Sequence, residues 1–208
     1  MLVKNLSAIL ILSSSLLLST SVMAMEDSEM IDESSSRPLP SAYVMSDRES
    51  KALECLKENL EKDRSQFFIN DQFDIMACCG YLTAVKWILD TECPAKPNQQ
   101  GMNMAFAFAA QSNQRKVVEF LHDLPVGQLR PDQEAINWAL IKSAKSSKNS
   151  MVHWLLSQQD GRLKPDQQAI NIAYEEASDN FGYIAPEDPR YDLMNETVAI
   201  LIPFTTKD

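Results

Sequence analysis

The sequence predicts an all-α fold: an α-solenoid of about four helix-turn-helix repeats behind an N-terminal capping helix. The first observation is a repeat. Residues 127–144 and 161–178 are identical at nine of eighteen positions at an offset of 34, where ordinary composition gives roughly one. The second is that apolar residues recur at helical spacing within each unit. Because one helical hairpin cannot bury its own apolar face, successive hairpins are expected to stack.

Each unit divides into two predicted helices. The first begins at a proline such as Pro131, because the missing N–H of proline costs nothing in a first helical turn. A short turn follows, at which Gly80, Asn113 and Ser147 align in successive units. The second helix then follows, as at residues 151–156, with its apolar side chains one turn apart.

The repeat domain is expected over residues 63–204. Its four units cover 63–95, 96–129, 130–163 and 164–204. In front of them, residues 47–62 place Leu53, Leu56 and Leu60 on one face and charged residues elsewhere. This pattern predicts an amphipathic helix that caps the N-terminal end of the stack.

The first unit resembles the ankyrin repeat. Residues 76–89 read MACCGYLTAVKWIL: small residues close the first helix, a glycine turn follows, and an apolar second helix comes next. Residues 116–121 and 152–156 resemble the same second helix. The Thr-Pro-Leu-His turn of ankyrin units is replaced, in the first unit by DQFD at 71–74, so longer first helices and degenerate finger loops are expected. The resemblance covers roughly residues 70–204 and implies ankyrin-like repeats.

The N-terminus has the layout of a secretory signal peptide over residues 1–24. Lys4 supplies a positive charge, an apolar stretch ends at Leu18, and small residues precede a cleavage site after Ala24. The uninterrupted apolar run is shorter than the roughly 20 residues that span a bilayer. Residues 25–46 are acidic and rich in serine, which predicts a disordered leader. We therefore expect an exported chain, periplasmic or secreted, whose mature part does not insert into a membrane.

Composition and motifs argue against several classes of function. The chain has 19 Lys and Arg against 29 Asp and Glu, a net charge of -10, which disfavours nucleic-acid binding. Its five glycines form no phosphate-binding cluster, and no HExxH, GxSxG, Walker or zinc-spaced pattern is found. His122 and His153 occupy different repeat positions and are expected to be ordinary surface histidines. The sequence thus predicts no catalytic, cofactor-binding or metal-binding residues.

Four cysteines lie in the N-terminal part of the exported chain: Cys55, Cys78, Cys79 and Cys93. Export makes disulfides feasible, and a bond from Cys55 in the capping helix to the first unit, with Cys93 as the candidate partner, would restrict the unfolded chain. The alternative is four small, partly buried thiols. Without a CxxC motif, a redox enzyme is not expected.

Two other series recur with the repeat. Asn103, Asn137 and Asn171 lie near the start of the first helices. They either tie one repeat to the next loop through their amides, which is the favoured interpretation, or line a ligand groove. Aromatic residues at 87, 120 and 154 lie on the apolar face of the second helices and are predicted to be core.

The fourth unit carries the predicted contact surface. Twelve extra residues fall within 181–193, where Gly182 and two prolines predict a projecting loop. Its Tyr183, Ile184 and Tyr191 are candidate partner-binding residues, as are Lys145 and Lys148 of the basic cluster before it. The alternative is that the loop aromatics fold back as a C-terminal cap.

These features together predict an exported, non-catalytic scaffold for protein–protein interaction, monomeric and without a cofactor. The partner is expected to be a protein, whose identity the sequence does not specify. One alternative is an envelope-anchored structural adaptor with an uncleaved signal. A less favoured one is an enzyme whose site is assembled across repeats.

Overall fold

The computed structural model of the chain describes residues 45–125, 127–158 and 164–206. The described residues all belong to one compact unit, Val44–Asp208. They form helices and no strands, which confirms the all-α prediction. The helices are α2 (Asp47–Lys62), α3 (Gln66–Cys78), α4 (Leu82–Leu89), α5 (Gln99–Gln111), α6 (Arg115–His122), α7 (Gln133–Lys145), α8 (Asn149–Leu156), α9 (Gln167–Gly182), α10 (Arg190–Leu201) and the short 3-10 helix η1 (Ile202–Phe204). The predicted signal peptide, its cleavage site at Ala24 and the leader up to residue 44 lie outside the described residues.

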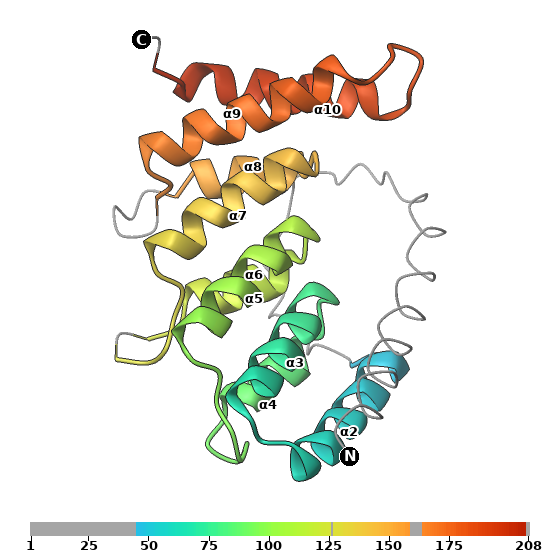
Figure 1. Ribbon diagram of the computed structural model, residues 1–208, viewed down its shortest axis with the longest axis vertical. Helices are drawn as coiled ribbons and strands as arrows, with labels where there is room; N and C mark the ends of the chain where they lie inside the picture. The colour runs from blue at the N-terminus through green and yellow to red at the C-terminus, as the bar shows by residue number, and fades with distance from the viewer. Residues whose placement is uncertain (1–44, 126, 159–163, 207–208) are drawn as a thin grey trace, which may run out of the picture. The chain divides into compact units, whose positions relative to one another are not determined.

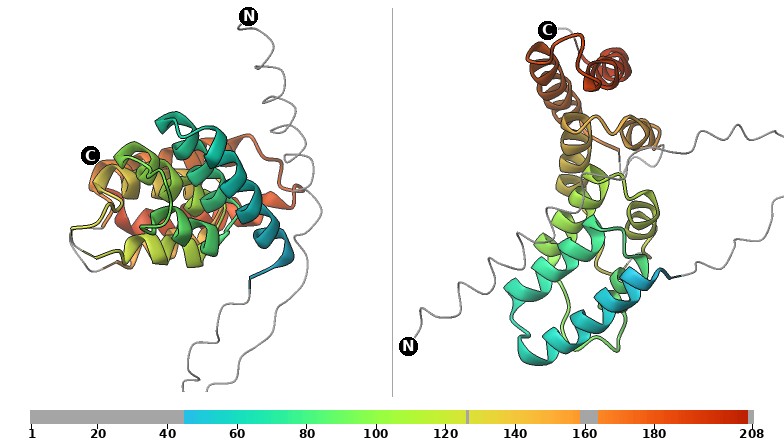
Figure 2. Two further views of the ribbon diagram at one scale, coloured as in Figure 1. Left: turned by 90° about the horizontal axis from the view of Figure 1, so that it is seen from below. Right: turned by 90° about the vertical axis from the view of Figure 1, so that its right-hand side faces the viewer.

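Long and short helices alternate along the chain. Helices α3, α5 and α7 have 13 residues each, and the helices that follow them, α4, α6 and α8, have 8. The long helices pack in series, α3 against α5, α5 against α7 and α7 against α9, and each contacts the helix that follows it. Within this unit, the long helices form one layer, and α2, α10 and the short helices form the other (Figures 1 and 2). Each pair falls within one predicted unit, and in each pair the first helix is longer than the second.

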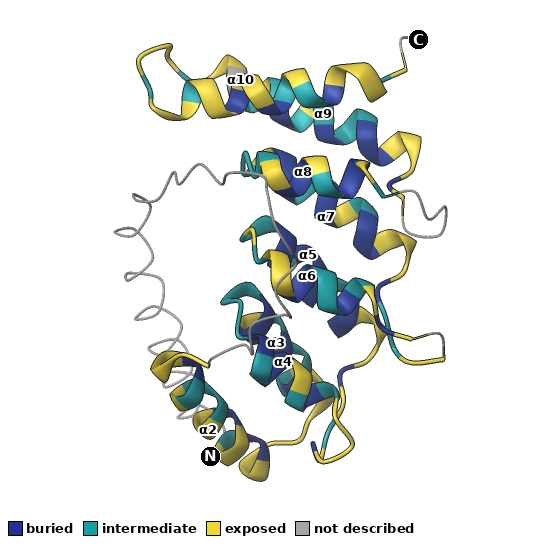
Figure 3. Ribbon diagram, turned by 180° about the vertical axis from the view of Figure 1, so that it is seen from behind, coloured by how far each residue is buried: buried dark blue, intermediate teal, exposed yellow. Residues whose placement is uncertain are grey.

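The core lies between these two layers. In α7 the buried side chains include Ala135, Ala139 and Ala144, whereas α8 contributes Val152 and Leu155. Alanine at the long-helix positions lets the neighbouring long helix approach closely, and the branched side chains fill the space between the layers. Buried positions accordingly lie on the sides of the helices that face their neighbours (Figure 3).

The turns between long and short helices share one conformation. Gly80, Asn113 and Ser147 have φ values of 76°, 57° and 51°, in the left-handed region. At the first of these turns the Tyr81 N–H donates to the Met76 carbonyl at 2.9 Å. This is the Schellman arrangement that ends a helix. The alignment of the three turn residues predicted from the sequence is confirmed.

The predicted capping helix is α2, which packs against α4. Its Glu49 is fully buried, and Glu49 Oε1 accepts a hydrogen bond from the Thr83 backbone N–H at 2.6 Å. Thr83 lies in the first turn of α4, whose own N-cap residue, Tyr81, makes no side-chain bond. Glu49 therefore caps α4 from a different helix, where its negative charge also suits the positive end of the helix dipole.

The prediction that the aromatic residues at 87, 120 and 154 are core is only partly right. All three rings are half-buried and pack at the margin of the core. A cation from the helix two places earlier in the chain (α2, α4 or α6) lies over each ring, and such a contact is favourable at a partly exposed site. The three pairs are Lys57 over Trp87 at 5.3 Å from the ring centroid, Lys86 over Phe120 at 5.3 Å and Arg115 over Trp154 at 5.2 Å.

The fourth helix pair departs from the others. Helix α9 ends at Gly182 and α10 begins at Arg190, so the connection covers only 183–189. The predicted loop over 181–193 is therefore too long at both ends, since Gly182 and Tyr191 belong to helices. Pro189 is the N-cap residue of α10. A proline there sacrifices no helical hydrogen bond and is compatible with the helix that follows.

Candidate functional site

A ladder of polar side chains joins successive long helices. Between α7 and α9, Gln133 donates through Nε2 to Asn137 Oδ1 at 3.0 Å and to the Lys164 carbonyl at 2.9 Å. Asn137 donates through Nδ2 to Asp166 Oδ2 at 2.6 Å, and its Oδ1 accepts from the Asp166 backbone N–H at 3.1 Å. Asp166 then caps α9 by accepting from the Ala169 N–H at 2.8 Å. The junction thus fixes both the register of the repeats and the start of the next helix.

The same arrangement recurs along the described stack. Its Gln–Asn pairs are Gln66 with Asn70, Gln99 with Asn103, Gln133 with Asn137, and Gln167 with Asn171. After α9, the Phe204 carbonyl accepts from Gln167 at 2.8 Å and Thr206 Oγ1 accepts from Asn171 at 3.3 Å. The interpretation that the repeated asparagines tie neighbouring repeats together is confirmed, because protein groups already engage their amides.

The position after each ladder asparagine lies toward the outer side of the long helices. These positions hold Asp71, Met104, Trp138 and Ile172. Trp138 is 42% exposed, and Phe67, one turn before Asp71, is 84% exposed. Large apolar side chains gathered on one exposed face mark an interaction surface more often than a solvated one. The long-helix patch is defined here as Phe67, Met104, Phe108 and Trp138.

Lys142 brings a positive charge into this patch. Its Nζ lies 4.9 Å from the centroid of the Phe108 ring and 5.7 Å from that of Trp138. Because these rings belong to α5 and α7, the ammonium group bridges two long helices through cation–π contacts. Nearby, Lys145 pairs with Glu176 of α9 at 2.7 Å. The apolar patch thus has a fixed cation between its aromatic rings.

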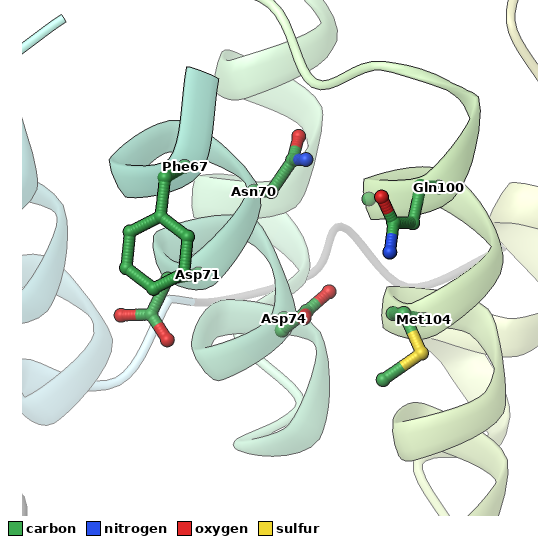
Figure 4. Close-up of a pocket in the computed structure, with 7 residues that line it drawn as sticks. Phe67, Asn70, Asp71, Asp74, Gln100 and Met104 are labelled. Carbon is green, nitrogen blue, oxygen red and sulfur yellow. The ribbon is translucent and has the colours of Figure 1, made fainter. Parts of the chain in front are cut away.

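A shallow pocket of about 190 Å³ opens between α3 and α5, at the Phe67 end of the patch. Asp74 points from α3 toward Met104 of α5, and Gln100 points back toward α3 (Figure 4). Gly101 forms part of the wall, and a Cβ added there would lie 2.7 Å from Asn70 Cγ. The corresponding residues in α7 and α9 are alanines, so the glycine permits the close approach of α3 and α5 at this junction.

The pocket is acidic. Burial is the main cause that raises the pKa of Asp74 from 3.8 to about 7, and the neighbouring Asp71 carboxylate raises it further. Asp74 Oδ1 is buried without a hydrogen-bond partner, although the side chain as a whole is half-buried. A pocket with two carboxyl groups in its lining, one of which has an unpaired oxygen, suits a ligand group that donates hydrogen bonds or carries a positive charge.

The structure distributes the predicted contact residues over several environments. Tyr183 is 91% exposed between α9 and α10, whereas Ile184 and Tyr191 are half-buried. Lys145 is in its ion pair, and Lys148 is half-buried at the start of α8. The exposed tyrosine does not act as the predicted cap, so that interpretation of Tyr183 is wrong.

No disulfide forms in the structure, where all four cysteines are free. Cys55 is exposed on α2, and Cys93 is buried with its Sγ donating to the Ala95 carbonyl at 3.0 Å. Within the described ranges, no group of three or more His, Cys, Asp or Glu side chains is placed to hold a metal ion. His122 instead contacts the edge of Trp154, with ring centroids 5.2 Å apart.

The long-helix patch and Asp74 were missed from the sequence. A signal was present, because Met104, Trp138 and Ile172 are apolar at one repeat position, which follows the ladder asparagine. Asn70 was missed because no Pro-Asp-Gln segment precedes it, although the Gln-x-x-x-Asn spacing of Gln66 and Asn70 matches the other ladder pairs.

Comparison of the chain with protein-family models, with curated proteins and with solved structures finds no significant match. Among the helices of the described residues, none is both long enough and apolar enough to cross a membrane.

Proposed function

We propose that this chain is an exported, non-catalytic scaffold for protein–protein interaction, built as an α-solenoid of ankyrin-like repeats. The stacked helix pairs, the repeated left-handed turn and the polar ladder support the repeat architecture. The observation that carries the function is the long-helix patch, in which Phe67 is 84% and Trp138 42% exposed. Aromatic side chains are the residues that most often dominate the energy of a protein interface.

Trp138 is the residue to test. The full chain is first used to capture proteins from extracts of the organism that produces it. Each captured protein is then purified, and its affinity is measured for the wild type, Trp138→Ser and His153→Ser. His153 is an exposed residue of α8, in the other layer, and serves as the matched control. We expect Trp138→Ser to weaken binding at least about tenfold and His153→Ser to have little effect. A partner that binds all three proteins equally contradicts the assignment of this surface.

Export is a separate part of the proposal and rests on the residues before 25. N-terminal sequencing of the protein from its native compartment is expected to find Met25 as the first residue. Retention of residues 1–24 would favour the alternative of an envelope-anchored adaptor instead. The other alternative, an enzyme with a site assembled across repeats, has no support from the side chains around Asp74, where no nucleophile or base accompanies the carboxyl groups.

A further inference from the structure

The acidic pocket has no cation of its own. Asp71 and Asp74 both line it from α3, while α5, which forms the opposite wall, contains no charged residue. Helix α4 also packs against α3, and its single charged residue, Lys86, is held over the Phe120 ring. Neither α4 nor α5 therefore supplies a positive charge that could pair with these carboxyl groups, and no Lys or Arg is among the residues that line the pocket.

The pocket continues into the apolar patch. Met104 lines the pocket from α5, and Phe108 follows one turn later on the same helix. The Lys142 ammonium group contacts both the Phe108 ring and the Trp138 ring of α7. An acidic pocket and an aromatic surface thus adjoin each other across three long helices. Along this surface the side chains change from acidic at α3 to aromatic at α5 and α7, where the Lys142 ammonium group lies against the rings.

We propose that this surface binds an extended segment of a partner protein that inserts a Lys or Arg side chain between Asp71 and Asp74 and lays an apolar side chain over Met104, Phe108 and Trp138. This inference rests on the proposed scaffold function and specifies its partner. A basic side chain supplies the charge and the hydrogen-bond donors that Asp74 Oδ1 lacks. The apolar side chain covers aromatic surface that is otherwise hydrated.

Geometry sets the spacing of the two anchors. Neighbouring helices pack about 8–10 Å apart, and an extended chain advances about 3.3 Å per residue. The groove between α3 and α5 is one helix spacing from that between α5 and α7. The basic and apolar anchors are therefore separated by about three residues in the bound segment.

Display of random peptides of about 12 residues, long enough to cross the patch, tests the proposal on the full chain. Selections use the wild type, an Asp71→Asn/Asp74→Asn variant and Glu175→Gln. Glu175 occupies the repeat position of Asp74 on α9 and is exposed, so it controls for the loss of a carboxylate. The wild type and Glu175→Gln are expected to enrich peptides with Lys or Arg about three residues from an aromatic or branched side chain. The double variant is expected to lose this basic preference and to bind the selected peptides about tenfold more weakly.

The outcomes separate this inference from the function on which it rests. Peptides that depend on Trp138 but show no basic preference overturn the inference and leave the scaffold function in place. Selection of the same peptides by the wild type and the double variant also overturns it. Failure to enrich any peptide on the wild type overturns the inference alone, because the scaffold function is tested by the titration of captured proteins against Trp138→Ser.

Titration of the Asp74 carboxyl carbon by NMR gives a second readout. Binding of a selected basic peptide is expected to lower the pKa of Asp74 from about 7 by at least about one unit, because a nearby cation favours the carboxylate. The same peptide with norleucine in place of Lys or Arg is expected to leave the titration nearly unchanged. A basic peptide that binds tightly without moving the Asp74 titration places the cation elsewhere and rejects this site.

Discussion

Asn137 and Asp166 form a reciprocal pair across two repeats: Asn137 Nδ2 donates to Asp166 Oδ2 at 2.6 Å, and the Asp166 N–H donates back to Asn137 Oδ1 at 3.1 Å. The carboxylate of Asp166 simultaneously caps α9. One side chain therefore couples the spacing of two repeats to the formation of a helix. This coupling explains why the same residue types return at each junction.

Asn137→Ala is expected to lower the free energy of unfolding by about 1–3 kcal/mol, because it removes both bonds to Asp166 and the acceptor of Gln133 Nε2. Asp166→Asn is the matched control. Asn98 already occupies this position at the first junction, bonds to Asn70 at 2.9 Å and caps α5, and Asn caps helices about as well as Asp. We expect a change below about 0.5 kcal/mol in urea unfolding for this control. Equal losses for both variants contradict the role assigned to the asparagine.

Glu49→Ala is expected to destabilise the protein by about 1.5–3 kcal/mol, the usual range for a hydrogen bond to a charged group. The variant leaves the Thr83 N–H unpaired at the start of α4, where Glu49 Oε1 now accepts at 2.6 Å. Glu49→Gln retains an acceptor and most of the volume, so a smaller loss is expected. Chemical denaturation of both variants tests this, and an unchanged midpoint for Glu49→Ala would show that α4 needs no cap from α2.

The left-handed turns predict opposite effects for two substitutions. Gly80→Ala places a Cβ at φ 76°, 2.7 Å from the Gln114 Cδ, and is expected to cost about 1–2 kcal/mol. Ser147→Gly removes the backbone strain of a serine at φ 51° and is expected to raise the free energy of unfolding by about 0.5–1 kcal/mol. This gain is expected although the variant loses the hydrogen bond from Ser147 Oγ to Met194 Sδ. Denaturation midpoints that shift in the same direction for both variants contradict the turn assignment.

Much of the fold was predictable because the repeat makes local signals reinforce one another. The period of 34 is enough to predict the helix pairs, the aligned turns and the asparagine ladder from the sequence. The capping helix was predicted at the same bounds as α2, since its leucines share one face and its charges, apart from the buried Glu49, lie elsewhere. These features depend on residues near one another in the sequence, or on exact repetition.

The candidate site was harder to predict because it depends on contacts between helices. Trp138 lies next to Ile136, Ala139 and Leu140 on α7, all of which are buried, so helical spacing alone places it near the edge of the core. Asp74 has no charged neighbour on α5, the helix across the pocket. This property depends on the sequence of the next unit and not on the residues around Asp74. The same reason explains the error at the second-helix aromatics, which are half-buried at the margin of the core.

Tyr183 and Tyr191 are expected to respond differently to truncation. Tyr183 is 91% exposed, so Tyr183→Ala should change stability by no more than about 0.5 kcal/mol. Tyr191 is half-buried within α10, and Tyr191→Ala should lower the melting temperature measurably. Because the proposed binding surface is on the long helices, Tyr183→Ala is also expected to retain partner binding. If Tyr183→Ala loses partner binding but keeps its stability, the connection between α9 and α10 is a contact site after all.

Asp74 makes stability depend on pH in a direction opposite to that of most carboxyl groups. In the unfolded chain its pKa is near 3.8, and in the folded protein burial and Asp71 raise it to about 7. Between these values the folded state binds a proton that the unfolded state has released, so this group's contribution to stability falls as the pH rises from about 4 to about 7 and is constant above. Replacing Asp74 by a residue that does not ionise therefore changes the free energy of unfolding most at higher pH.

Asp74→Asn is accordingly expected to raise the free energy of unfolding at about pH 8 by about 1–2 kcal/mol, a value reduced because the side chain is partly exposed and its charge is screened. At about pH 4 the two proteins should be almost equally stable. The measurement is the difference between wild type and variant in urea unfolding across this range, which cancels the other titrating groups. Glu175→Gln, at the same repeat position on α9, is the matched control for the loss of a carboxylate. A wild type that equals or exceeds Asp74→Asn in stability at about pH 8 would show that the buried carboxylate has a compensating partner, and the pocket would then be unsuited to a cationic ligand.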